Sequence, residues 1–356
     1  MRKGITVLEL LIATVLSLVV LAAVYSAYLT LFKSYKKEGT AITTQMESTI
    51  GLEVLRQDLE HAGYGISKDE TNFPLEVFHL PKTPPNCQAP SVHLVIRSTY
   101  KTSDDDTQGW AVLSCNAGDV PHCLAYYNFP YCPRERAATE AVLLRPDGSF
   151  FPPQSPTKGG HPPTYFIVDD SGDRCSSTVS TLLAFPISGS GEWERCDNTI
   201  VPSCQNQFCN VIEYYLDEDS DAQSPYCEGT YVLKRRVDRR EEPFLDCVGD
   251  FKVVYDWNGS LCDPSGQDPN LPACPVPSNA TELRNNLKMV YVYLLLREGK
   301  EDKDFRFKYG TSFNVDGVTL NLPVNLDYYT KDGHDPLKFR WRVVKIAVKP
   351  MNLLRY

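Results

Sequence analysis

The hydrophobic pattern divides the chain into a long apolar N-terminal helix and a following region of short strands. Residues 5–32 form a stretch of 28 residues whose only charged side chain is Glu9. About 20 apolar helical residues cross a bilayer, so this stretch is long enough to do so. Arg2 and Lys3 precede it, which predicts a cytoplasmic N-terminus and an extracytoplasmic remainder.

The helix is predicted to run from Ile5 to about Ala62, well beyond the apolar stretch. Apolar residues recur at spacings of three and four, as on one helical face: Ile42, Met46, Ile50, Leu52, Leu55 and Leu59. Charged residues are assigned to the opposite face: Glu47, Glu53, Arg56 and Asp58. Gly63 and Gly65 predict the C-terminal end of the helix. We therefore expect its second half to pack on the rest of the chain.

After residue 65, short segments rich in Val, Ile, Tyr and Leu alternate with Pro, Gly, Asn and Asp, a pattern typical of strands and turns. It predicts nine strands: 92–97, 141–144, 165–168, 182–185, 211–216, 231–237, 251–257, 287–297 and 341–348. The stretches 98–140 and 258–282 are predicted to be the most irregular. The expected fold class is α+β, with the long helix packed on a mostly antiparallel, β-rich head.

The cysteines predict that this head folds in an oxidising compartment. There are twelve of them, an even number, and all follow residue 80: Cys87, Cys115, Cys123, Cys132, Cys175, Cys196, Cys204, Cys209, Cys227, Cys247, Cys262 and Cys274. No Cys-x-x-Cys pair is present, which disfavours a zinc ribbon, a thioredoxin-type motif and a haem attachment site. We expect disulfides, with the pairing left open.

Charged and titratable residues give no strong indication of a ligand site. The net charge of −9 argues against nucleic-acid binding. Basic residues in 234–240 and 340–349 are interpreted as polar strand faces or subunit contacts. Asp217, Asp219 and Asp221 are a weak calcium candidate, because Ala222 stands where an EF-hand loop needs glycine. The six histidines are dispersed and are predicted to lie on the surface or in loops. No catalytic motif is present, so neither an enzyme nor a cofactor is expected.

Three interpretations of the N-terminal segment compete. It is an uncleaved signal anchor, a cleaved secretory signal peptide, or the leader and helix of a specialised precursor. A signal peptide is disfavoured because the apolar run continues past the small-x-small site at residues 24–26, and because Glu9 lies inside it. A carboxylate in an apolar span costs on the order of a few kcal/mol unless it has a partner, which points to a function for Glu9.

Residues 2–10, RKGITVLEL, resemble the class III leader of type IV prepilins. The resemblance implies that prepilin peptidase cuts between Gly4 and Ile5 and that the new N-terminus is methylated. It also implies that Glu9, fifth in the mature chain, pairs with the N-terminal amine of a neighbouring subunit; a buried carboxylate needs such a cation. Ile5 departs from the phenylalanine of the commonest pattern.

Further segments resemble PilW-type minor pilins, and together they cover about a third of the chain. They are the helix end LRQDLEHAGY (55–64), the segment PFLDCVGDFKVVY (243–255), the strand 287–297 and the close 340–355. The cysteine-rich loops match no family pattern. The resemblance divides the chain into a leader (1–4), a transmembrane or filament half of the helix (5–32), a head-packed half (33–65) and the head (66–356).

The function that this resemblance implies is that of a minor pilin of a type IV pilus. The chain is expected first in the inner membrane, with its head periplasmic, and later in the extracellular pilus. The expected partners are prepilin peptidase, the major pilin, other minor pilins and a tip adhesin. The large head favours priming or tip assembly. Two alternatives stay open: a minor pseudopilin similar to GspJ in a type II secretion system, and an uncleaved membrane-anchored adhesin or binding protein. Motility, adhesion and DNA uptake are not distinguished.

Overall fold

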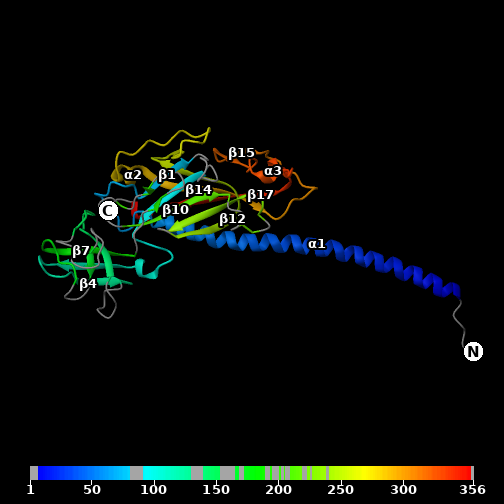
Figure 1. The fold of residues 1–356 in the computed structure, drawn as a ribbon, viewed down its shortest axis with the longest axis horizontal. Coiled ribbons are helices and arrows are strands. Elements are labelled where there is room, and N and C mark those ends of the chain that lie inside the picture. Colours follow the sequence, from blue (N-terminus) through cyan, green and yellow to red (C-terminus); the bar gives the residue numbers. More distant parts are fainter. Residues whose placement is uncertain are drawn as a thin grey trace, which may run out of the picture.

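The computed structural model shows a long helix that projects from a β-rich head (Figure 1). It describes residues 7–80, 91–129, 139–152, 165–167, 172–188, 193–194, 200–201, 204, 209–218, 223–224, 227–237 and 240–353. Within the helix, the side chains of Glu9, Thr30 and residues 33–48 lie outside the described set. The N-terminal end of the helix lies far from the head, whereas the C-terminal end of the chain lies against the head.

The predicted long helix is confirmed as α1, Val7–Glu60. Its 54 residues span about 80 Å at 1.5 Å per residue. Two glycines end it as the sequence predicts. Gly63 and Gly65 have φ angles of 80° and 67°, in the left-handed region that glycine enters without strain.

The head is built on a mostly antiparallel sheet, which confirms the expected β-rich part. In spatial order this main sheet contains β1 (Leu75–Leu80), β2 (Ser91–Ser98), β10 (Asn210–Asp217), β11 (Tyr231–Val237), β12 (Arg240–Trp257), β14 (Leu287–Glu298) and β17 (Arg340–Val348). A short strand, β13 (Ser260–Cys262), pairs with β12. Every neighbouring pair is antiparallel.

The last turns of α1 pack on one face of the main sheet. Leu55, Leu59 and Ala62 are fully buried in one cluster with strand residues such as Leu245 and Phe251. Strand β12 approaches the helix closely at Gly51, where an added Cβ would lie 3.1 Å from the Leu245 side chain. The expected packing of the helix on the head is thus confirmed for its final turns.

Two details of the predicted helical face are wrong. Ile50, assigned to the buried stripe, is 69% exposed. Asp58, assigned to the polar face, is only 1% exposed. The spacing explains the second error, since Asp58 lies three residues after Leu55 and four before Ala62. These offsets place all three on one helical face.

A second antiparallel sheet is inserted between β2 and β10. Its spatial order is β4 (His122–Tyr127), β3 (Trp110–Cys115), β7 (Val179–Ile187), β5 (Thr139–Leu144) and β6 (Tyr165–Ile167). It has its own core, centred on Leu113, Phe151, Tyr165 and Leu182. Because β2 and β10 pair directly in the main sheet, the chain leaves this sheet for the insert and returns to it at neighbouring positions. It forms the end of the molecule opposite the free end of α1 (Figure 1).

All nine predicted strands are present, but the irregular stretches were judged wrongly. β3 and β4 lie in 98–140, and β13 and α2 (Ala280–Asn286) lie in or overlap 258–282. The second stretch is ordered partly by Asp263. Its carboxylate accepts hydrogen bonds from the backbone N–H groups of Ser265, Gln267 and Asp268 at 2.8, 2.6 and 2.7 Å.

Smaller elements cover the face of the main sheet that is opposite α1. The hairpin β15–β16 packs its buried Val318 and Leu320 against Val254 and Tyr293. The helix α3 contributes Tyr329 to a neighbouring cluster. The bounds of the remaining elements are β8 (Trp193–Glu194), β9 (Ile200–Val201), β15 (Ser312–Val315), β16 (Val318–Asn321), α3 (Asp327–Thr330) and the 3₁₀ turns Asp105–Thr107, Pro336–Lys338 and Met351–Leu353.

The predicted disulfides are confirmed for the described cysteines. The pairs are Cys115–Cys175, Cys204–Cys209, Cys227–Cys247 and Cys262–Cys274. Cys123 is also disulfide-bonded. Cys87, Cys132 and Cys196 lie outside the described residues. The four bridges join segments within the insert, within the main sheet and at its margins, as expected for a head that folds under oxidising conditions.

The packing of α1 on the sheet gives a first prediction. Leu59→Ala removes a fully buried side chain and should lower the free energy of unfolding of the head by about 2–5 kcal/mol. Ile50→Ala, on the same helix but 69% exposed, is the matched control and should change it by less than about 0.5 kcal/mol. Urea unfolding of the full chain in detergent micelles, followed by tryptophan fluorescence, measures both. Equal effects of the two substitutions would contradict the packing described.

Candidate functional site

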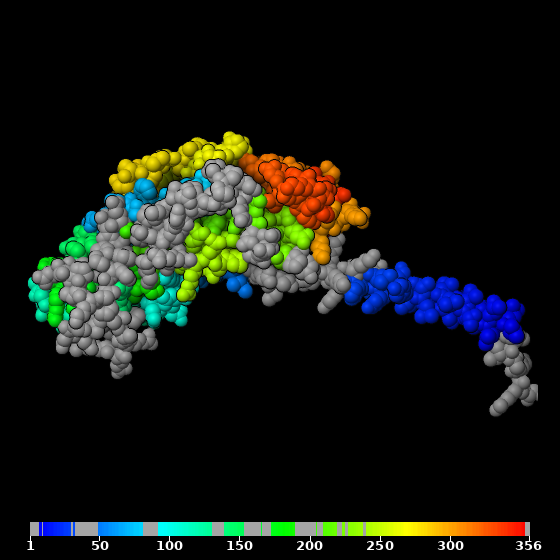
Figure 2. All heavy atoms as spheres, in the orientation of Figure 1, coloured from blue at the N-terminus to red at the C-terminus, as the bar shows by residue number. Residues whose placement is uncertain are grey.

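The first half of α1 presents an apolar surface to its surroundings on all sides. Every described side chain from Val7 to Leu29 is exposed, including Leu11, Val19 and Tyr25 at 57%, 61% and 63%. Residues Leu10–Leu29 are long and apolar enough to cross a membrane, judged by length and composition. A membrane anchor and a signal sequence both fit this helix. Figure 2 shows it projecting clear of the head.

The predicted processing residues lie at the end of this helix. Gly4 and Ile5 are outside the described residues, and so is the side chain of Glu9. The backbone of Glu9 is helical and immediately precedes the candidate span that begins at Leu10. Cleavage after Gly4 and the pairing of Glu9 therefore stay predictions.

At the other end of α1, a buried ion pair joins the helix to the main sheet. Asp58 Oδ2 lies 3.0 Å from Arg235 Nε, and these side chains are 0% and 3% exposed. Tyr214 donates its hydroxyl to the same oxygen at 2.6 Å. Thr102 donates to Asp58 Oδ1 at 3.1 Å and accepts from Arg235 Nη2 at 2.7 Å. Hence α1, β10, β11 and the segment that leads into the insert share one hydrogen-bonded network.

The protonation of Tyr214 suits its place in this network. Burial, followed by the nearby charge of Asp58, raises the pKa of the Tyr214 phenol well above its usual value. The hydroxyl consequently remains a donor to the carboxylate at all physiological pH values. A buried Asp–Arg pair with its remaining lone pairs hydrogen-bonded is the arrangement in which the cost of desolvation is offset. Asp58 has a structural role that links the helix to the head.

Aromatic contacts reinforce the joint between α1 and the head, which is formed by the network around Asp58 and Arg235. The rings of His61 and Tyr100 stack with centroids 3.8 Å apart, and Tyr64 meets Phe185 of the insert edge-to-face at 4.9 Å. The backbone N–H of Gly63 donates to the carbonyl of Arg97 at 2.9 Å. The segment after α1 is therefore held by both sheets.

Most of the basic residues singled out in the sequence are neutralised within the head. Arg235 pairs with Asp58 and Glu242, and Arg236 pairs with Glu213 and Glu241. Pairs of the C-terminal region join Arg340 to Asp302, Arg342 to Glu298 and Lys345 to Asp316. Opposite charges placed across adjacent strands stabilise a sheet. The partly exposed Arg340, Arg342 and Lys345 fit the interpretation as polar strand faces. Arg235 does not, because it is buried in the contact with α1.

Asp217, one of the three weak calcium candidates, forms an ion pair with a lysine. Asp217 Oδ2 lies 2.7 Å from Lys234 Nζ, which also pairs with Glu241 at 2.8 Å. Asp219 and Asp221 lie outside the described residues. Within the described part of the chain, no group of three or more His, Cys, Asp or Glu side chains is placed to hold a metal ion.

One histidine contradicts the prediction of surface or loop positions. His93 lies in β2 and is 4% exposed, with Nδ1 2.9 Å from Glu213 Oε1. Its ring stacks between those of Phe78 and Tyr215, with centroids 5.1 and 5.0 Å away. Side chains of a strand point alternately to its two faces, so His93 lies on the same face of β2 as Val95, which is buried. This spacing could have indicated that His93 is buried as well. His161 lies outside the described residues.

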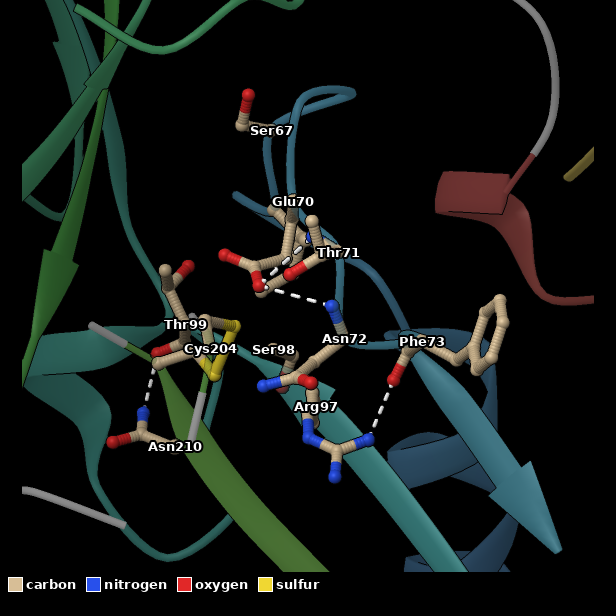
Figure 3. Close-up of a disulfide and its surroundings, with 12 residues drawn as sticks. Ser67, Glu70, Thr71, Asn72, Phe73, Arg97, Ser98, Thr99, Cys204 and Asn210 are labelled. Atoms are coloured by element: carbon tan, nitrogen blue, oxygen red, sulfur yellow. Dashed lines mark hydrogen bonds between the residues drawn. A yellow bond between two sulfur atoms is a disulfide. The ribbon is translucent and has the colours of Figure 1, made fainter. Parts of the chain in front are cut away.

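The Cys204–Cys209 disulfide packs beside a buried polar turn (Figure 3). Glu70 is 2% exposed, and its carboxylate accepts from the backbone N–H groups of Thr71 and Asn72, both at 3.1 Å. Arg97 Nη1 donates to the Phe73 carbonyl at 2.7 Å. The disulfide belongs to an apolar cluster with Val95 and Val211 of the main sheet. The disulfide and this turn therefore lie where the insert rejoins the main sheet. The polar groups of Glu70 and Arg97 stabilise the backbone there.

Comparisons with protein-family models, with curated proteins and with solved structures find no match to this chain.

The joint gives a second prediction. Asp58→Ala leaves the buried Arg235 charge without this carboxylate and should cost about 3–5 kcal/mol of unfolding free energy. Glu53→Ala is the matched control, because its ion pair with Arg56 is exposed and should be worth at most about 1 kcal/mol. The double variant Asp58→Leu with Arg235→Met should recover most of the loss. Urea unfolding that ranks Asp58→Ala no lower than the control would refute a stabilising joint.

The carboxylates on the sheet give a third prediction, for acid conditions. Burial opposes the ionisation of Glu241, but hydrogen bonds from Lys234, Tyr215 and Arg236 outweigh it and lower its pKa from 4.5 to about 2. A depressed pKa stabilises the fold above pH 4.5, and this contribution is lost as the pH falls towards 2. The native chain should therefore lose more stability between pH 5 and pH 2 than Glu241→Gln does. Parallel pH profiles of the two proteins would disprove this contribution.

Proposed function

We propose that this chain is a minor subunit of a type IV pilus, inserted in the inner membrane and processed by prepilin peptidase. The observation that carries the proposal is a single 54-residue helix with two different ends. Its first half exposes a mainly apolar surface over Leu10–Leu29, and its last turns are buried in a β-rich head. Together with the prepilin-like leader, this is the design of a subunit that assembles through its helix.

The dimensions of the helix suit both a bilayer and the core of a filament. Residues 10–29 rise about 30 Å, the thickness of the hydrocarbon region. In a filament, apolar helices of neighbouring subunits replace the lipid. The same side chains that face acyl chains before assembly then face other helices afterwards, so no refolding is needed.

Glu9 gives the assembly its register in this proposal. It immediately precedes the apolar span, where an ionised carboxylate is costly unless a cation lies nearby. Cleavage after Gly4 supplies one, the ammonium group of Ile5 on a neighbouring subunit. Pairing then fixes the axial position of one helix against the next.

The head suits a place at the tip or in a priming complex. It consists of a main sheet and an inserted sheet, with the insert remote from the free end of α1 (Figure 1). A head of this size is sterically awkward in a repetitive shaft. The expected partners are the major pilin, other minor pilins and a tip adhesin. We assign the chain no enzymatic activity and no cofactor.

The role of Glu9 gives a fourth prediction, tested in cells with the native gene replaced. Glu9→Ala and Glu9→Gln should both be cleaved normally, because the cut lies four residues earlier, yet both should lose most surface pili. Glu53→Gln, in the exposed Glu53–Arg56 pair of the same helix, is the matched control and should leave pili unchanged. Immunoblots of sheared and cellular fractions measure assembly and cleavage separately. Normal piliation in the Glu9→Ala strain would remove the pairing role.

A further inference from the structure

Strand β4 lies at the edge of the insert sheet and is exposed along its whole length. Among the described residues it pairs on one side only, with β3. Each of the 6 residues of His122–Tyr127 is exposed. Figure 1 shows β4 in the part of the head that is opposite the free end of α1. A partner that approaches the head from that end can therefore reach this strand.

Large hydrophobic side chains are exposed together at β4 and at the adjoining part of β3. Those exposed on these two strands are Trp110, Leu124, Tyr126 and Tyr127. The other large hydrophobic side chains that are exposed in the described part of the head lie on three separate segments: Val276, Tyr309 and Met351. Exposed apolar side chains that gather in one place mark an interaction site more often than scattered ones do.

Trp110 and Tyr127 form an aromatic pair across the two strands. They are directly opposite each other in the β3–β4 ladder, so their side chains lie on the same face of the sheet. The two residues are 39% and 64% exposed. The face of an indole or phenol ring attracts a cation, and it attracts the planar guanidinium of arginine most often. This pair can therefore hold a cationic side chain.

Exposed carboxylates lie near both ends of β4. Asp105 and Asp106 belong to the 3₁₀ turn before β3, and the Asn128 amide donates to the Asp105 carbonyl at 2.7 Å. Since Asn128 directly follows Tyr127, this turn lies beside the end of β4. Asp119 is exposed in the connection that precedes β4. No ion pair involves these three carboxylates in the described part of the chain. Their charge remains to attract a partner.

This surface is held in place although β4 pairs on one side only. Cys123, in the middle of β4, is disulfide-bonded. Gly109 packs so closely on the backbone of Asn128 that an added Cβ would collide with the Asn128 carbonyl. The turn before β3 and the end of β4 are thus in direct backbone contact. A partner would bind without first ordering these segments.

We propose that the surface formed by Trp110, Tyr127, Asp105 and Asp106 docks an extended segment of a partner protein that carries arginine or lysine. A cationic side chain of the segment stacks on the aromatic pair, and its charge faces the two carboxylates. An extended chain fits because the unpaired edge of β4 offers it backbone groups along the strand, which a helix cannot use. This docking concerns the insert alone and goes beyond the proposed assembly through α1.

Three short peptides with blocked ends test the proposal. They alternate threonine with arginine, with glutamine or with glutamate. Isothermal titration calorimetry of the full chain in non-ionic detergent micelles, with empty micelles as the blank, should show saturable binding of the arginine peptide. Its dissociation constant should be on the order of 0.1 mM at low salt and should rise as salt is added. The glutamine peptide should bind about tenfold more weakly, and the glutamate peptide more weakly still.

Charge variants locate the binding. The double variant Asp105→Asn with Asp106→Asn should weaken binding of the arginine peptide about fivefold, because both charges that face the cation are removed. The matched control is Asp304→Asn with Asp332→Asn, which removes two other exposed carboxylates near β15 and α3. It should change the affinity by less than about twofold.

Ring variants test the aromatic pair separately. Tyr127→Thr keeps a residue that suits a strand and should weaken binding of the arginine peptide about fivefold. Tyr309→Thr is the control, since Tyr309 is also exposed, at 56%, but lies outside the insert. It should leave the affinity unchanged. Circular dichroism melting identifies any variant that has lost its fold.

Three results would overturn the proposal. The first is the absence of saturable binding of the arginine peptide to the native chain. The second is equal binding of the arginine and glutamine peptides. The third is a loss of affinity in the control variants as large as that in the folded variants of the β4 surface. Each of these results concerns the insert and leaves the assembly role of α1 to its own tests.

Discussion

The buried pair of Asp58 and Arg235 is the interaction on which the arrangement of this molecule depends. It lies where the long helix, the main sheet and the segment entering the insert meet. Leu55 and Leu59 bury apolar surface on either side of Asp58. The enclosed ion pair adds a directional contact that opposes any change in the rotation or register of the helix, because a slip would leave an ion buried without its partner.

This constraint separates the two tasks of α1. The final turns are held rigidly by Asp58, by the His61–Tyr100 stack and by the turn at Gly63 and Gly65. The first half is left with apolar side chains facing outward, and a membrane or neighbouring helices would remove them from water. Since both halves belong to one continuous helix, the position of the head follows directly from how the first half is packed. That coupling suits a subunit whose head must be presented at a defined place on an assembly.

The sequence predicted what periodicity and composition determine, namely the helix, nine strands and an oxidised head. It failed where a residue's role depends on a distant partner. Asp58 was assigned to solvent because it is charged, although its spacing from Leu55 put it on the buried face; Arg235, far along the chain, is what makes burial tolerable. His93 was misassigned for the same reason, with Glu213 as the distant partner. The turn-rich stretch 98–140 concealed β3, whose pairing with β7 is not local, and with it β4, which pairs with β3.

The central claim is that this chain is processed as a prepilin and assembles through the exposed half of α1. It is tested most directly by the N-terminal sequence and intact mass of the protein isolated from membranes. The account predicts a chain that begins at an N-methylated Ile5, with a mass lower than the full sequence by residues 1–4 and higher by one methyl group. A chain that still begins at Met1 would contradict processing and indicate a plain anchor. A chain that begins near Ala27 would mean a secreted head without its apolar helix and would contradict the claim altogether.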